Sequence, residues 1–397
     1  MSIRTRVLTA VVWNLLIAGP ASVSVAAGGS SAPIKAPDFL FVPGADGIAN
    51  LACAPAAAKE LAPIITGLLE SAGVDPQIVV VLATQPLICN DIYYVPLAND
   101  ICGIGYQHET KGELFDETPD SRLEGIAFLN DFPYWQEHPA EFQKDFNHEI
   151  SHRWGARLHA SIAGADSTTL LGRDLQHWSY FLRNGGSPLE GNIWTEVGAG
   201  HYRADTPLGP GVFSDLDLYT MGVMPPSEVG KQEILLPLAD SGATDCLGFT
   251  LTAASPPQSC GAYETDATPL TVGIDDVIAA EGERNPPAAR TAKSVDMAVV
   301  VLESGSLPFD LQSCQAMTQA VPDRIADFAT ASAGRVTLVN LVTSGDDCAS
   351  FTQPAGTGPA TSGGCSMAPL GSSPHGPEAL LLAALFVVSR RARRALR

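Results

Sequence analysis

Residues 139–154 carry two histidines within a segment that has the pattern of an amphipathic helix. Large apolar residues recur in it at every fourth position: Phe142, Phe146, Ile150 and Trp154. Pro139 suits the first turn of a helix and Gly155 suits its end. On such a helix His148 and His152 lie one turn apart on the same side. The sequence therefore predicts a helix over 139–154 that presents two imidazoles to one ligand.

Glu149 stands between these histidines, so the segment reads His148-Glu149-Ile150-Ser151-His152. Imidazoles at this spacing can bind one metal ion, and the carboxylate between them can reach a bound water without being a ligand. The segment resembles the H-E-x-x-H signature of the zincin metallopeptidases. The resemblance implies that His148 and His152 bind Zn²⁺ and that Glu149 is the general base in hydrolysis of a protein or peptide substrate.

The third zinc ligand is not fixed by this segment. Metzincins continue with a glycine and a further histidine, but here Leu158 occupies the position of that histidine and His159 comes one residue later. We predict His177 as the third ligand, because it lies in the aromatic segment 175–181, which favours a dry pocket. The alternatives are Asp217, which would follow an N-cap at Ser214, and His159, Glu190 and Glu196.

Several runs upstream and downstream of this helix predict an α+β fold. Strand-like runs occupy 78–83, 92–96, 123–129, 234–238 and 297–302, and helical patterns occupy 54–74, 274–281 and 322–329. The order of strands followed by a helix with the chemistry resembles that of zincins. We therefore expect a zincin-like domain over 28–350, with a mixed sheet, an active-site helix and an irregular, glycine-rich C-terminal subdomain.

Both termini resemble targeting segments. Residues 1–27 combine early arginines, an apolar run and small residues ending at Ala27, which is typical of a secretory signal peptide. A flexible linker over 351–378 contains Cys365, and an apolar run followed by arginines fills 379–397. This end resembles the MYXO-CTERM sorting tail of myxobacterial surface proteins. The resemblance implies processing near Cys365 and a secreted or surface-displayed protein that meets the membrane only through its tail.

Charge and cysteine content agree with export. The chain has 43 acidic and 23 basic residues, a formal charge of −20, which disfavours binding to nucleic acid or to an anionic bilayer. In an exported chain we expect disulfides between neighbours in the sequence, with Cys53 left unpaired. The expected pairs are Cys89–Cys102, Cys246–Cys260 and Cys314–Cys348. The sequence indicates no oligomeric state.

Three functions remain open at this point. The leading prediction is a zinc metallopeptidase, in which His201, Tyr202 or Tyr219 could stabilise the oxyanion. The alternative from another class is a non-catalytic surface or adhesion protein that retains a zincin fold, which the tail and the acidic composition would also suit. A zinc amidase acting on peptidoglycan would use similar chemistry.

Overall fold

The protein is a mixed α+β structure. The computed structural model describes residues 32–52, 58–86, 92–108, 122–204, 211–244, 248–255, 262–305, 309–343 and 347–351. They belong to one compact unit that extends to Gln353, and they form seven α-helices and three β-sheets. The expected signal peptide, the linker with Cys365 and the C-terminal tail lie outside the described residues.

The larger sheet has seven strands in the order β1-β2-β14-β3-β5-β4, with β15 beside the first half of β14. β2, β14, β3 and β5 run parallel, whereas β1 and β4 are antiparallel to their neighbours. The bounds are Ile34–Ala36 (β1), Phe39–Val42 (β2), Ile78–Ala83 (β3), Tyr93–Pro96 (β4), Gly125–Asp131 (β5), Ser294–Leu302 (β14) and Thr337–Asn340 (β15). β3 and β5 are buried throughout, which explains why their sequences are continuously apolar rather than alternating.

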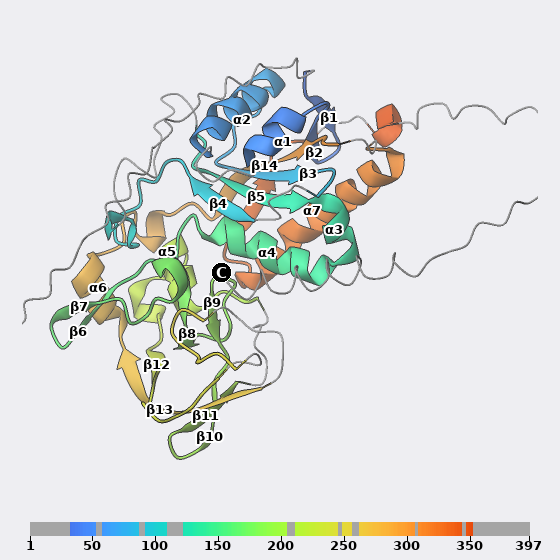
Figure 1. The fold of residues 1–397 in the computed structure, drawn as a ribbon. Helices are drawn as coiled ribbons and strands as arrows, with labels where there is room; N and C mark the ends of the chain where they lie inside the picture. The colour runs from blue at the N-terminus through green and yellow to red at the C-terminus, as the bar shows by residue number, and fades with distance from the viewer. Residues whose placement is uncertain are drawn as a thin grey trace, which may run out of the picture. The chain divides into compact units, whose positions relative to one another are not determined.

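Helices cover both faces of this sheet (Figure 1). Because side chains alternate along a strand, β3 directs Ile78, Val80 and Leu82 to one face and Val79 and Val81 to the other. The first group packs with α3, α4 and α7, and the second packs with α1 and α2. The bounds are Asp46–Ala52 (α1), Ala58–Ala72 (α2), Phe132–Glu137 (α3), Pro139–Ser151 (α4) and Leu311–Ala331 (α7).

A second sheet of six strands comes after α4, in the order β10-β11-β13-β12-β8-β9. Adjacent strands in this sheet are antiparallel, except β8 and β9, which are parallel. The bounds are Trp178–Arg183 (β8), Glu190–Asn192 (β9), Thr195–Gly198 (β10), His201–Ala204 (β11), Gln232–Pro237 (β12) and Tyr263–Val272 (β13). A separate hairpin pairs Ala160–Ile162 (β6) with Ala165–Ser167 (β7).

The prediction of an irregular, glycine-rich subdomain is wrong for this region. Several of its glycines lie in the turns that join short strands. Gly164 and Gly200 have φ values of 81° and 72° and lie in the turns before β7 and β11. A positive φ is readily adopted by glycine, so the glycine content reflects the number of tight turns.

Helix α5, Asp215–Met221, contributes side chains to the cores of both the larger sheet and the second sheet. Leu218 and Met221 pack in the core that contains α4 and one face of the larger sheet, whereas Leu216 and Tyr219 pack in the core of the second sheet. The remaining helix is Ile274–Glu281 (α6), and the short 3₁₀ helices are Tyr106–His108 (η2), Arg173–Leu175 (η3), Pro226–Glu228 (η4), Ala288–Arg290 (η5) and Cys348–Phe351 (η6).

Most predicted elements that lie in the described residues have observed counterparts. β3 and α6 have the predicted bounds, and β4, β5, β12 and β14 differ from prediction by a few residues. The predicted helix 322–329 is only part of α7, which begins eleven residues earlier at Leu311. Pro322, the first residue of the predicted helix, lies in the interior of α7. The predicted helix 54–74 is represented by α2, which begins at Ala58.

The cysteine predictions have three different outcomes. Cys314 and Cys348 form the expected disulfide, which ties α7 to η6. Cys102 is a free, exposed thiol in the described structure, so its predicted pairing with Cys89 is wrong. The backbone of Cys102 forms an isolated antiparallel β-bridge with that of Asn285. The other cysteines of the expected pairs, Cys89, Cys246 and Cys260, and the expected unpaired Cys53 lie outside the described residues.

Among the helices that the structure describes, none is both long and apolar enough to cross a membrane.

Candidate metal centre

His148 and His152 lie at the C-terminal end of α4. The apolar stripe of this helix is buried in the core against the larger sheet, as its four-residue spacing predicted. The helix ends at Ser151 instead of Trp154, because the amides of His152 and Arg153 bond to carbonyls three residues back in a tighter turn. The two imidazoles still lie on the same side of the chain.

His177 approaches these two residues from the segment that leads into β8. The turn before it, η3, contains two non-glycine residues with positive φ, Asp174 at 57° and Leu175 at 55°. Trp178 follows and is fully buried, and its indole Nε1 donates a hydrogen bond of 2.7 Å to Asp217 on α5. His177 therefore lies between the tight turn at η3 and the buried, hydrogen-bonded side chain of Trp178.

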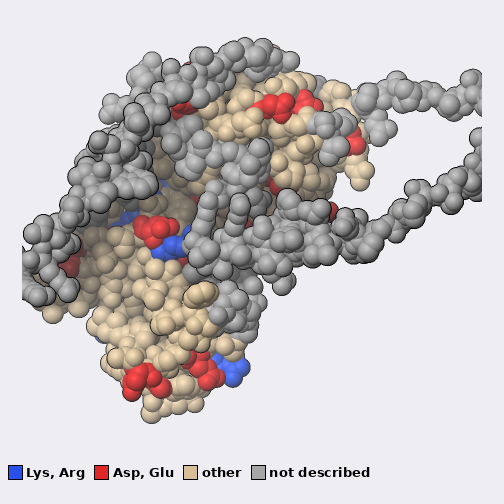
Figure 2. Space-filling view, viewed as in Figure 1, with Lys and Arg blue, Asp and Glu red and all other residues tan. Residues whose placement is uncertain are grey.

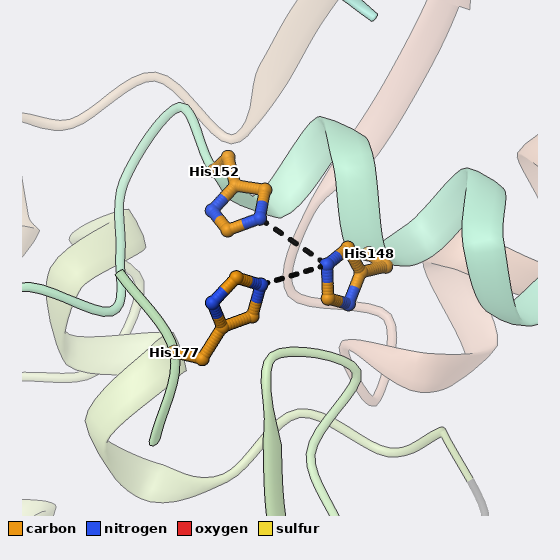
Figure 3. Close-up of side chains that lie close together, drawn as sticks. All are labelled: His148, His152 and His177. Atoms are coloured by element: carbon orange, nitrogen blue, oxygen red, sulfur yellow. Dashed lines mark hydrogen bonds between the residues drawn. The ribbon is translucent and has the colours of Figure 1, made fainter. Parts of the chain in front are cut away.

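The three imidazoles converge through the same atom, Nε2 (Figure 3). Nε2 of His148 lies 3.2 Å from Nε2 of His152 and 3.2 Å from Nε2 of His177. Each side chain offers one nitrogen to a group in which all such atoms lie within 4.8 Å of one another. All three residues are at least nine-tenths buried. The structure therefore contains a buried three-histidine cluster that can hold a metal ion.

Backbone carbonyls orient all three rings. The Nδ1 to oxygen distances are 2.7 Å for His148 and Pro188, 3.3 Å for His152 and Gly155, and 3.0 Å for His177 and Arg173. A carbonyl can only accept, so each Nδ1 carries the proton and each Nε2 keeps its lone pair. Histidines that bind metals commonly have their second nitrogen held in this way.

The spacing of the nitrogen atoms fits a single ion. Imidazole nitrogens bind zinc at about 2.0–2.1 Å, and in a tetrahedral arrangement they are then about 3.3 Å apart. The two closest Nε2 pairs are 3.2 Å apart. The distances therefore suit one ion bound by all three nitrogen atoms.

Burial keeps the three rings neutral. Loss of hydration lowers the pKa of His148 to about 3, although its bond to the Pro188 carbonyl acts in the opposite direction. Burial also holds the pKa values of His152 and His177 well below the usual range, and the neighbouring His148 lowers both further. A neutral imidazole is the form that binds a metal.

Glu149 lies beside the cluster but is not part of it. Its Oε1 is 3.9 Å from Nε2 of His148, and the side chain is almost completely buried. Burial raises the pKa of Glu149 well above its usual value, the Asp145 carboxylate raises it further, and Arg173 lowers it. A carboxyl group in this position can exchange a proton with a molecule bound beside the histidines.

The alternative third ligands occupy other environments. Asp217 accepts hydrogen bonds from the backbone and hydroxyl of Ser214 in a capping box at the start of α5, in addition to the bond from Trp178. His159 bonds through Nδ1 to Asp166 in the β6–β7 hairpin. Their roles in the structure are accounted for by these bonds.

The remaining acidic candidates are also engaged elsewhere. Glu190 forms an ion pair with Arg173, with Oε1 at 2.6 Å from Nη2. Glu196 lies on exposed β10 and accepts a bond from the amide of Gly200. The structure thus brings together His148, His152 and His177 among the histidines and acids considered.

The donors expected to stabilise an oxyanion lie in the second layer. His201 forms ion pairs with Glu264 and Asp266 across β11 and β13. Tyr202, on the same strand, is buried in the core of the second sheet. The hydroxyl of Tyr219 accepts a bond from the backbone of Arg284.

The sequence reasoning missed Arg173. Its Nη2 lies 3.1 Å from Nε2 of His177, so a guanidinium adjoins the cluster. A single arginine in a turn has no periodic pattern to reveal it. The sequence feature that could have identified Arg173 is its position four residues before His177, because a compact turn brings residues at that spacing together.

Comparison with protein-family models, curated proteins and solved structures gave no match.

Proposed function

We propose that the protein is a zinc-dependent hydrolase that cleaves peptide bonds, with His148, His152 and His177 as the zinc ligands and Glu149 as the general base. The observation that carries the proposal is the convergence of three neutral Nε2 atoms next to a buried carboxyl group. This arrangement supports the zincin-like assignment made from the H-E-x-x-H segment.

The choice of zinc follows from the donor set. Three imidazoles without a thiolate or carboxylate suit zinc, and they leave a fourth position for water or substrate. Sites of that kind are typical of catalytic rather than structural zinc. Copper and nickel also bind imidazole well, so the metal has to be identified by analysis of the purified protein.

Each residue then has a distinct task. The carbonyls of Pro188, Gly155 and Arg173 hold the ligand rings in the orientation required for binding. When bound, zinc supplies Lewis acidity toward the scissile carbonyl and the attacking water. Glu149 accepts the proton of that water and transfers it to the leaving amine.

A peptide substrate has a suitable strand to pair with. β4 is an edge strand of the larger sheet, and among the described strands it pairs with β5 alone. The segment after it reaches the end of α4, where Asn99 donates a bond of 3.0 Å to the carbonyl of Arg153 and Tyr106 donates one to that of His152. An extended peptide that added to β4 would extend this sheet by one strand.

Export is part of this proposal. The disulfide between Cys314 and Cys348 suits an oxidising compartment, in agreement with the expected signal peptide and sorting tail. On the face drawn in Figure 2, the described surface carries scattered acidic and basic groups and no continuous basic area. The formal charge of −20 also favours a protein or peptide over nucleic acid as the partner.

Metal analysis combined with a digestion assay tests the proposal. The purified mature protein should contain one zinc per chain, and it should cleave casein or a peptide library in a reaction that a chelator stops and added zinc restores. Stoichiometric zinc without cleavage of any peptide would favour the alternative, a non-catalytic surface protein. Absence of bound metal would contradict the site itself.

A further inference from the structure

Among the described cationic side chains, Arg173 is the one with a bond to an imidazole ring of the cluster. Its Nη2 lies 3.1 Å from Nε2 of His177, and its Nε and Nη2 lie 3.2 and 2.6 Å from Oε1 of Glu190. Glu190 is buried, whereas the side chain of Arg173 is 39% exposed. The guanidinium is therefore anchored on its buried side and borders solvent on the other.

The charges around the cluster leave a place for an anion. Imidazoles that bind a metal are neutral, and the charged side chains in described contact with the histidine rings are Glu149 and Arg173. The negative charge of Glu190 offsets that of Arg173. Together with a divalent ion, these groups have a net charge of about +1, and two cations this close repel unless an anionic atom lies between them.

We propose that Arg173 binds the anionic oxygen of a ligand seated beside the three histidines. This inference rests on the proposed function and assigns the oxyanion-binding residue of the same site. When water adds to the scissile carbonyl, the electron pair of the C=O bond moves to its oxygen and the water proton moves to Glu149. The guanidinium of Arg173 donates hydrogen bonds to the oxygen that receives the charge.

The geometry favours Arg173 over the donors predicted from sequence. His201 and Tyr219 are bonded to groups in the second layer, whereas Nη2 of Arg173 already occupies the lone pair of a ligand nitrogen. Arginine remains charged at all relevant pH values and offers several donors in a fixed plane. A metal ion that binds Nε2 of His177 must displace Nη2 of Arg173 from that atom. Nη2 can then donate a hydrogen bond to the ligand.

The test measures anion binding separately from catalysis. In the cobalt-substituted protein, the visible spectrum reports both metal binding and ligand binding, and methylphosphonate serves as a tetrahedral oxyanion. Arg173→Gln should weaken methylphosphonate about 10- to 100-fold, the range expected for loss of a hydrogen bond to a charged group. Its cobalt affinity should stay the same or rise, because a neighbouring positive charge is removed.

Two further variants complete the test. Arg173→Gln combined with Glu190→Gln avoids a buried, unpaired carboxylate and should show the same loss of anion affinity. Arg203→Gln on β11 removes an equal charge from an exposed side chain elsewhere and should leave methylphosphonate binding unchanged. Unchanged anion affinity in both Arg173 variants would overturn the inference. Loss of cobalt affinity would assign Arg173 a structural role, and failure of the wild type to bind cobalt would overturn the proposed function as well.

Discussion

Glu149 is the residue whose substitution separates chemistry from binding. Glu149→Gln should abolish peptide hydrolysis, with a loss of several orders of magnitude, because the amide cannot accept the proton from water. Zinc content and thermal stability should be almost unchanged, since the two side chains have nearly the same shape. Digestion assays and metal analysis on the same preparation check this. Cleavage at the wild-type rate by the zinc-loaded variant would place the chemistry elsewhere.

His177 and His159 form a matched pair for testing the third ligand. His177→Ala should lower zinc affinity by orders of magnitude, because one of three converging nitrogens is lost. His159→Ala should have little effect, since that ring bonds to Asp166 in the β6–β7 hairpin. Competition with a chromogenic chelator measures both affinities. Equal losses in the two variants would contradict the assignment of His177.

His201 provides a pH-dependent contact away from the cluster. Hydrogen bonds to Asp266 and Glu264 raise the pKa of His201 above its ordinary value of 6.5. The stabilising contribution of these pairs is therefore complete below about pH 6.5, the unfolded value, and is lost as pH rises through the higher folded value. NMR titration should show the raised pKa, and Asp266→Asn should lower it. An unchanged pKa in that variant would rule out the pairing as its cause.

Single residues differ in how far the sequence predicts them. His148 and His152 are adjacent through helix periodicity, so their proximity follows from local geometry. His177 was preferred for its aromatic neighbours, and its approach depends on the turn at η3. Arg173 depends on that same turn, with positive φ at Asp174 and Leu175, which no local propensity indicates.

At the scale of elements, the capping of α5 is open to a direct test. Asp217→Ala should lower the free energy of unfolding by about 2–3 kcal/mol, because it leaves buried donors of Ser214 and Trp178 without an acceptor. Urea denaturation measures the loss. Asp215→Ala, at a partly buried position on the same helix whose carboxylate accepts one bond from Gly230, should cost far less. Similar losses in both variants would contradict a capping role for Asp217.

The elements themselves were predictable in proportion to their length and periodicity. The buried run of β3 and the stripe of α4 are strong signals, and both agree with the structure. The strands of the second sheet were mostly missed because several have only three or four residues, and exposed β10 has no apolar face. The pairing that makes them strands comes from distant residues, such as β13 beside β11.

For the molecule as a whole, the disulfide should contribute to stability without affecting the site. Cys314 and Cys348 are 34 residues apart, and closing a loop of that length lowers the entropy of the unfolded chain by an amount worth about 3–4 kcal/mol. Replacing both with alanine should reduce the free energy of unfolding accordingly, as measured by denaturation. Zinc affinity should be unchanged, because the disulfide ties α7 to η6 and has no bond to the histidines. Loss of zinc in this variant would contradict that separation.

The position of β14 has a consequence for how the chain is made. This strand lies at the centre of the larger sheet, between β2 and β3, yet it is residues 294–302 and follows the whole second sheet in sequence. On the ribosome, the edges of β2 and β3 that pair with β14 therefore remain without this partner while the more than two hundred residues between β3 and β14 emerge. Contacts of such long sequence separation form slowly, so the newly made chain depends on protection of these strands until its last third has been synthesised.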